Sequence, residues 1–185
     1  MKHSLIAKRH QSQLVIIDVQ EKLAAAMSAD AIAAVTRNCS ILLQAAALLQ
    51  IPSLYTEQYP QGLGGTLPEL LPFLASKSRV EKITFSCCDE LKFNRQLAND
   101  RPQVILAGLE SHICILQTAL QLQALGRQVF VVEDAVLSRS AENKANALSR
   151  LRHAGVIVSN TESVVFEWLG AAEGQAFKQI SQLVR

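Results

Sequence analysis

The sequence has few aromatic residues and no run of like charges. Aromatic side chains make up 5% of the 185 residues, and 18 basic against 16 acidic side chains leave a formal net charge of +2. Surfaces that bind nucleic acids or anionic membranes are usually visible as clusters of basic residues. We therefore expect neither a nucleic acid nor a membrane among the partners of this chain.

Cysteine is sparse as well. The four cysteines are Cys39, Cys87, Cys88 and Cys114. Their positions show neither the Cys-x-x-Cys spacing of a zinc site nor the density of a disulfide-stapled secreted module. No histidine spacing indicates a metal site, and the segment AGLESH lacks the Gly-x-Gly-x-x-Gly pattern of a dinucleotide-binding loop. We expect reduced thiols, no metal and no cofactor.

Long uncharged apolar runs are also absent. The first residues, MKHSLIAKRHQSQ, contain no apolar stretch of the length found in signal sequences, and no uncharged apolar run elsewhere approaches the length of a membrane span. The sequence therefore predicts a soluble, cytoplasmic protein.

Hydrophobic residues are plentiful, at 49% of the chain. A chain of this length favours one domain, here covering residues 1–185, with a core on both faces of a sheet. Short β-branched runs alternate with stretches of helical periodicity, and the runs cover 14–17, 51–55, 104–107, 129–132 and 156–158. Such alternation predicts an α/β fold, with a parallel β-sheet between two helical layers.

The other elements follow from periodicity and from glycine and proline. Helices are expected over 31–50, 89–99, 111–124, 142–154 and 172–184, and a short strand over 79–85. Asp89 is expected near an N-cap, and Gly126 and Gly155 are expected to end two helices. The segment 56–72 contains three glycines and three prolines, which predicts a long surface loop.

Asp18 ends the apolar run LVIID, at the carboxyl end of an expected central strand. Ligands of open parallel sheets bind beyond the carboxyl ends of the strands. Partial burial at that edge favours the protonated form of a carboxyl and suits it to proton transfer. The alternative is that Asp18 caps a following turn or helix.

Cys114 lies in the first turn of the helix expected after VILAGLESH, with Gly108 at the strand end. The positive end of a helix dipole lowers the pKa of a thiol, so this position suits a nucleophilic cysteine. The free amides of the same turn could form an oxyanion hole. The alternative is a small buried hydrophobic residue between Ile113 and Ile115.

Lys82 lies beside Glu81 in RVEKITFS, and a lysine in such a position is usually a solvated surface residue. Its functional interpretation depends on the other two residues. If Lys82 reached between Asp18 and Cys114, its charge would stabilise a thiolate and orient the carboxylate.

His112 and two further cysteines are weaker candidates. Residues at i and i+2 of a helix point about 200° apart, so His112 is expected in the wall of a site or in an interface rather than paired with Cys114. Cys87 and Cys88 could have a redox role, but two local core or surface thiols are the favoured interpretation. Cys39 is expected in the core.

The motifs LVIIDVQ, EKITFS and GLESHIC, with Asp18, Lys82 and Cys114, resemble those of the isochorismatase-like cysteine hydrolases in order and surroundings. The resemblance covers essentially the whole chain. It implies a Cys-Asp-Lys catalytic triad at these three positions. It also implies a cis peptide bond between Leu109 and Glu110, which would direct the amides of Glu110 and Cys114 at the substrate oxygen as an oxyanion hole.

The segment TEQYPQGLGGTLPEL is similar to that of a metal-free branch, the isochorismatase domain-containing proteins. Nicotinamidases of the superfamily hold a metal with Asp and His residues after the second strand, where this chain reads YTEQY. Isochorismatases proper cleave a vinyl ether and generally lack the nucleophilic cysteine, which is present here. The resemblance therefore implies chemistry at an amide-like carbon.

The expected activity is hydrolysis of a small amide-like substrate through a thioester intermediate. Residues from strand edges near the triad are expected to form the substrate pocket, namely Gln20, Tyr55, Gln58 and Phe85, with His112 in the wall. Two alternatives are a catalytically weak binding or scaffold protein and a thiol-redox protein. The apolar C-terminal helix favours a homo-oligomer, although a helix packed on its own sheet gives the same pattern.

Overall fold

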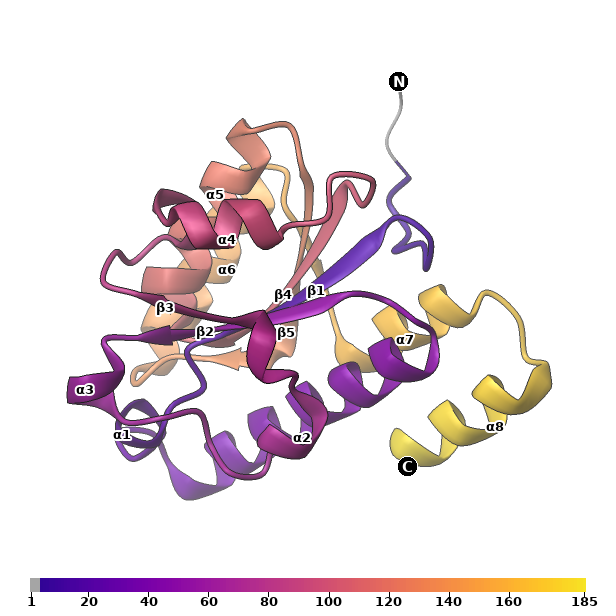
Figure 1. Cartoon of the computed structure of the whole chain (residues 1–185), viewed down its shortest axis with the longest axis horizontal. Coiled ribbons are helices and arrows are strands. Elements are labelled where there is room, and N and C mark those ends of the chain that lie inside the picture. Colours follow the sequence, from indigo (N-terminus) through magenta and orange to yellow (C-terminus); the bar gives the residue numbers. More distant parts are fainter. Residues whose placement is uncertain (1–3) are drawn as a thin grey trace.

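The structure, a computed structural model, describes residues 4–185. A sheet of six parallel strands forms the middle layer, with helices against both faces (Figure 1). The strands are β1 (Ser12–Ile17), β2 (Ser53–Gln58), β3 (Arg79–Lys82), β4 (Gln103–Leu109), β5 (Gln128–Leu137) and β6 (Ile157–Ser159). This architecture confirms the predicted α/β fold.

The strand order is β3-β2-β1-β4-β5-β6. The chain builds one half of the sheet from β1 outward to β3 and then returns to build the other half from β4. The direction of the crossovers therefore changes between β1 and β4, which is where open parallel sheets bind ligands. Ile17 of β1 pairs with Gly108 of β4 at this place.

Helices cover both faces of the sheet. Their bounds are α1 (Glu21–Ala24), α2 (Ala29–Leu48), α3 (Pro60–Leu63), α4 (Leu91–Gln96), α5 (Leu116–Ala124), α6 (Ala141–His153), α7 (Thr161–Leu169) and α8 (Gly174–Leu183). In Figure 1, α4, α5 and α6 lie above the sheet and α2, α7 and α8 lie below it. The molecule thus has one core on each side of the strands.

Consecutive residues of β1 alternate between the two cores. Leu14 and Ile16 pack with α2 and α7, whereas Val15 and Ile17 pack with α4 and α5, and none of the four is more than 1% exposed. Side chains alternate along a strand, so a strand covered on both faces needs a continuous apolar run. Each of these side chains contributes about 1.5 to 3 kcal/mol on burial.

Helix α2 is long and apolar enough, by length and composition alone, to cross a membrane. Asp30 and Arg37 interrupt its apolar sequence. In the structure, one face of α2 packs against β1 and β5 and contributes Val35, Cys39 and Leu42 to the core. Because core helices meet the same criterion of length and composition, this helix is only weak evidence for a membrane.

The structure differs from the predicted boundaries in several places. The strand predicted over 79–85 ends at Lys82, and the strand predicted over 129–132 continues to Leu137. Residues 56–58 of the predicted loop complete β2 instead, because they pair with β3. The helix predicted over 89–99 is shorter, and Asp89 lies in a 3₁₀ turn before α4 rather than at its N-cap. Helix α7 was not predicted from TESVVFEWL, because its β-branched residues favour a strand. Asn160 caps it by accepting a hydrogen bond from the Ser163 amide.

Candidate active site

Asp18 is the first residue after β1, and its side chain is fully buried. Thr56, on the neighbouring strand β2, donates its hydroxyl to Asp18 Oδ1 over 2.6 Å. The backbone of Asp18 is left-handed, with φ of +51°, which costs a residue with a side chain about 1 to 2 kcal/mol. Asp18 does not cap α1, because Gln20 occupies that position. Strained, buried polar residues of this kind are typical of functional sites.

Lys82 is the last residue of β3, and its side chain has no exposed area. Its Nζ atom lies 2.7 Å from Asp18 Oδ2. Nζ also donates to Gln58 Oε1 over 2.6 Å and to the carbonyls of Thr84 and Phe85, each over 3.2 Å. A buried ammonium needs such partners to replace water. The interpretation of Lys82 as a solvated surface residue is therefore wrong.

Cys114 lies in a π-helical turn (Ser111–Ile115) that joins β4 to α5. The residue is 6% exposed, and its Sγ atom lies 3.5 Å from Lys82 Nζ. Single π-helical turns are rare and are frequent at functional sites. The structure thus brings Asp18, Lys82 and Cys114 together at the carboxyl end of the sheet.

The charges of this group fix its resting protonation. Burial raises the pKa of the Cys114 thiol above its ordinary value of 9.0, the Asp18 carboxylate raises it further, and Lys82 opposes both only in part. Burial is the largest influence on the pKa of Lys82 and lowers it, but the charges of Asp18, Cys114 and Cys87 and the hydrogen bond to Asp18 together outweigh burial and raise that pKa above its ordinary value of 10.5. At neutral pH, the Cys114 thiol is therefore protonated and neutral, and Lys82 is cationic.

The sequence predicted a lowered pKa for Cys114, and this prediction was wrong in sign. The prediction was based on the helix dipole, whose stabilising effect on a thiolate falls off within one turn of the helix end. Burial and the neighbouring Asp18 carboxylate both disfavour the thiolate, and together they outweigh the favourable charges. The Cys114 thiol is therefore harder to deprotonate than the sequence predicted. Its reaction as a nucleophile depends more strongly on a base that removes the thiol proton.

The turn between β4 and Cys114 depends on a glycine. Gly108 has φ of +119°, and a Cβ atom there would lie 2.0 Å from the Ile17 carbonyl oxygen. The predicted cis bond between Leu109 and Glu110 is not found, because residues 4–185 contain no cis peptide. Gly108 and the π-helical turn reverse the chain with trans bonds, without the cost of about 3 to 4 kcal/mol of a cis bond.

A cavity of about 100 Å³ lies beside Cys114. Its lining consists of Leu23, Gln58, Leu63, Phe85, Glu110, Ile113 and Cys114. Most of these side chains are apolar, and the carboxylate of Glu110 is held by Arg139, which donates its backbone amide and Nε to Oε1 over 3.0 Å each. Of the expected wall residues, Gln58 and Phe85 border this cavity, which we call the catalytic cavity.

Residues 12–163 match the isochorismatase domain. The chain belongs to the isochorismatase-like hydrolase family. Isochorismatase domain-containing protein 2 of Bos taurus is 39% identical over 177 residues, which cover 94% of this chain and 83% of that protein.

Solved structures agree with this membership in the isochorismatase family. A structure described as MAR1 ribonuclease from Caenorhabditis elegans superimposes with a TM-score of 0.89 at 34% identity, covering 96% of this chain and 91% of that one. The YcaC gene product of Escherichia coli, described as an octameric hydrolase of unknown specificity, gives a TM-score of 0.89 at 19% identity, covering 99% and 92%. At that identity, the second likeness shows the fold alone.

Two expected wall residues of this isochorismatase-family chain lie elsewhere. Gln20 is fully buried, and its Nε2 donates to the carbonyls of Gln58 and Gly64 over 3.0 and 2.7 Å. It therefore connects the end of β2 to the segment after α3 and does not line the cavity. Tyr55 belongs to the core under α2. Neighbouring residues of a strand face opposite sides, and Thr56 already faces Asp18.

His112 also lies outside the lining of the catalytic cavity. Its Nδ1 is 3.0 Å from Ser138 Oγ, and its Nε2 is 3.5 Å from Asn143 Nδ2. The ring therefore joins the π-helical turn to the start of α6. The expectation that His112 does not pair with Cys114 agrees with these contacts.

Sequence reasoning missed Thr56, which hydrogen-bonds Asp18. The contact follows from the parallel register, in which Ile17 of β1 pairs with Thr56 of β2. The signal was present in the sequence as a hydroxyl directly after the apolar run 51–55, but only the register relates that hydroxyl to Asp18.

The remaining cysteines are buried and free. Cys39 lies on the buried face of α2 and belongs to the core, as predicted. Burial, with a contribution from Asp18, raises the pKa of Cys87 to about 12, and the Cys87 amide donates to Thr118 Oγ1 over 3.0 Å. Within residues 4–185, no group of three His, Cys, Asp or Glu side chains is arranged to hold a metal ion.

Proposed function

We propose that this chain is a cysteine hydrolase that cleaves the C–N bond of a small amide through a thioester on Cys114. One observation carries the proposal. The Lys82 ammonium lies 2.7 Å from Asp18 Oδ2 and 3.5 Å from Cys114 Sγ, all three residues are buried, and Cys114 borders a cavity. This arrangement provides a nucleophile, a base and a fixed positive charge at one point.

In the first step, Asp18 accepts the proton of the Cys114 thiol while the sulfur attacks the carbonyl carbon. The electron pair of the C=O bond moves to oxygen, and we propose that the backbone amides of Glu110 and Cys114 stabilise the oxyanion there, although the peptide bond between Leu109 and Glu110 is trans. Lys82 remains cationic throughout, as its raised pKa favours. The positive charge of Lys82 stabilises the Asp18 carboxylate before the proton is transferred. It also stabilises the thiolate that develops on Cys114.

In the second step, the tetrahedral intermediate collapses and the C–N bond breaks. The protonated Asp18 gives its proton to the leaving amine, which leaves an acyl group on Cys114 as a thioester. Asp18 then removes a proton from a water molecule, which attacks the thioester and releases the acid. The thiol regains its proton from Asp18, so one carboxyl serves as base and acid in turn.

The cavity indicates a small substrate. A volume of about 100 Å³ is well below the roughly 300 to 1,000 Å³ of drug-sized ligand sites. Leu23, Leu63, Phe85 and Ile113 supply apolar walls. We therefore propose an amide with a short, uncharged acyl group.

The structure disfavours the thiol-redox alternative. Redox-sensing cysteines have a lowered pKa and are accessible to solvent. Cys114 has a raised pKa and is 6% exposed. The scaffold alternative predicts the same geometry without turnover. A measurement of turnover therefore distinguishes it from hydrolysis.

The direct test measures ammonia release from formamide, acetamide, propionamide and isobutyramide, and the intact mass of the protein after rapid quenching. We expect turnover of at least one amide and a mass increase equal to its acyl group. Cys114→Ala should lose both, with a rate lower by at least about a thousandfold. Cys39→Ala removes a thiol from the opposite core and should keep turnover.

A short RNA is included in the same panel, because one structural relative is described as a ribonuclease. Cleavage of RNA that survives Cys114→Ala would contradict the proposal. So would amide turnover that is unchanged in Cys114→Ala. Absence of any turnover or acyl adduct across the panel would favour the scaffold alternative.

A further inference from the structure

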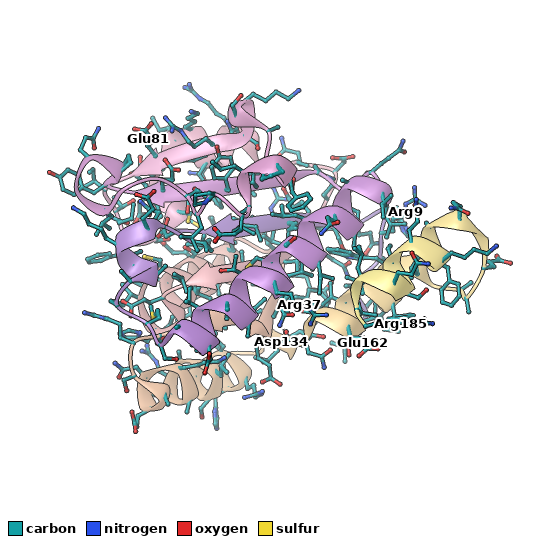
Figure 2. The ribbon with its side chains drawn as sticks, turned by 90° about the horizontal axis from the view of Figure 1, so that it is seen from below. Arg9, Arg37, Glu81, Asp134, Glu162 and Arg185 are labelled. Carbon is teal, nitrogen blue, oxygen red and sulfur yellow. The ribbon has the colours of Figure 1, made fainter. Side chains whose placement is uncertain are left out.

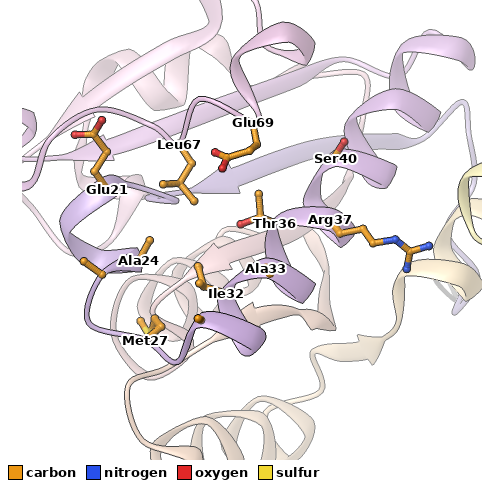
Figure 3. Close-up of a pocket in the computed structure, with 12 residues that line it drawn as sticks. Glu21, Ala24, Met27, Ile32, Ala33, Thr36, Arg37, Ser40, Leu67 and Glu69 are labelled. Carbon is orange, nitrogen blue, oxygen red and sulfur yellow. The ribbon is translucent and has the colours of Figure 1, made fainter.

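A second cavity lies on the surface between α1, the first half of α2 and residues 67–69 (Figure 3). Its volume is about 720 Å³, within the range of about 300 to 1,000 Å³ for small-molecule sites. We call it the α1–α2 cavity, and its lining consists of Glu21, Ala24, Ala25, Met27, Ala29, Ile32, Ala33, Thr36, Arg37, Ser40, Leu67 and Glu69. None of these residues borders the catalytic cavity.

The hydroxyl of Thr36 gives this cavity a specific polar point. Thr36 is 8% exposed, and its Oγ1 has no hydrogen-bond partner within residues 4–185. A threonine inside a helix commonly bonds the carbonyl one turn earlier, and Thr36 does not. Figure 3 shows the hydroxyl turned into the space between Leu67 and Ile32. A buried unpartnered hydroxyl is unfavourable, and a ligand that accepts its hydrogen bond removes this cost.

The charges at the opening of the α1–α2 cavity are negative. Glu69 is exposed, its carboxylate is turned into the cavity in Figure 3, and Glu21 is exposed at the edge. Neither forms an ion pair with another residue in the described part of the chain. Arg37 extends away from the cavity, and its Nη2 donates to the Arg185 carbonyl over 3.2 Å, beside which it lies in Figure 2.

We propose that the α1–α2 cavity binds a small organic amine. The apolar body of the ligand packs on Met27, Ile32 and Leu67, its protonated nitrogen lies beside Glu69, and a carbonyl or hydroxyl on it reaches Thr36. The site is separate from the proposed hydrolase chemistry and does not depend on it. The two cavities share α1, because Leu23 borders the catalytic cavity and Ala24 borders this one.

The probe is 2-phenylethylamine, titrated into ¹⁵N-labelled protein and followed by amide chemical shifts. Its neutral match is 2-phenylethanol and its anionic match is 3-phenylpropanoate. We expect saturable shifts at residues 24, 32, 36 and 67. The amine should bind about two- to fivefold more tightly than the alcohol, as expected for an exposed charge pair, and the carboxylate should bind most weakly.

Four variants locate the site. Ala33→Phe fills the cavity and should abolish binding, whereas Ala34→Phe places the same ring on an adjacent exposed position outside the lining and should not. Glu69→Gln should weaken the amine about two- to fivefold and leave the alcohol unchanged. Thr36→Val should weaken 2-amino-1-phenylethanol, which adds a hydroxyl to the same amine, about two- to tenfold and leave 2-phenylethylamine unchanged.

Thr36→Val also tests the cavity without a ligand. If the hydroxyl is unpartnered in the free protein, its replacement by an isosteric methyl should leave the melting temperature unchanged or raised. A lowered melting temperature would overturn the assignment of a free hydroxyl.

Three further results would overturn the proposal. The first is equal binding of amine, alcohol and carboxylate, or no saturation at tens of millimolar probe. The second is binding that survives Ala33→Phe. The third is a concentration-dependent dimer that Ala33→Phe disrupts and Ala34→Phe does not, because a second copy of the chain would then cover this face.

Discussion

Both faces of the sheet bury cysteines, and Cys39 and Cys114, which lie on opposite faces, have different surroundings. Cys39 lies on the buried face of α2 among apolar side chains, with its Sγ 3.7 Å from the Ala135 carbonyl, and burial raises its pKa to about 12. Cys114 is also buried with a raised pKa, but it lies 3.5 Å from Lys82 Nζ and borders a cavity. Burial alone therefore does not make a thiol a nucleophile. The polar groups at the carboxyl ends of the strands distinguish Cys114.

The largest effect is expected from the buried ion pair. Lys82→Met leaves Asp18 charged and unpaired, which should lower the free energy of unfolding by about 3 to 5 kcal/mol in urea denaturation. The double variant Asp18→Asn/Lys82→Met removes both charges and should recover part of this loss. Arg152→Met breaks the exposed pair between Arg152 and Glu133 and should cost at most about 1 kcal/mol. Equal losses for the buried and exposed pairs would contradict the comparison.

The next effect concerns the close approach of β1 and β4. Gly108→Ala adds a Cβ against the Ile17 carbonyl and forces alanine to φ of +119°, so the free energy of unfolding should fall by about 3 kcal/mol. Gly126→Ala is the matched control, because Gly126 has φ of +82° with open space around it. It should cost about 1 kcal/mol. Similar losses for both would show that the contact with Ile17 has no role.

Thr56→Val tests the hydrogen bond that orients Asp18. The loss of a bond to a charged group should cost about 1.5 to 3 kcal/mol of stability. If Thr56 positions the base, kcat should fall about tenfold with little change in KM, and Thr56→Ser should restore kcat. A variant whose kcat is unchanged, or one that Thr56→Ser does not rescue, would reduce Thr56 to a structural residue.

Most of the fold was predictable because the strands carry continuous apolar runs. Four consecutive buried residues in β1 fit a strand covered on both faces. Helix α7 was missed because Val164 and Val165 favour a strand locally. The helix depends on tertiary contacts, including the hydrogen bonds from the amide and hydroxyl of Thr161 to Asp134 over 2.8 Å each.

The positions of the site residues were more predictable than their surroundings. Asp18 follows β1, Lys82 ends β3 and Cys114 lies in the turn after β4, so a parallel sheet places all three at one edge. The hydrogen bond from Thr56 to Asp18 and the face of the sheet on which Tyr55 lies both depend on the register between β1 and β2. No single motif in the sequence shows this register. The sign of the pKa shift of Cys114 depends on how deeply its sulfur is buried, which no local pattern shows.

The central claim is that Asp18 and Cys114 share a proton beside Lys82, and alkylation of Cys114 by iodoacetamide tests it most directly. Because the thiolate reacts and the pKa of Cys114 is raised, the rate should increase with pH through pH 9 without reaching a plateau. The charge of Asp18 raises that pKa, so Asp18→Asn should lower it and speed alkylation at pH 8 while abolishing amide turnover. A plateau below pH 8 in the wild type, or slower alkylation in Asp18→Asn, would contradict the account.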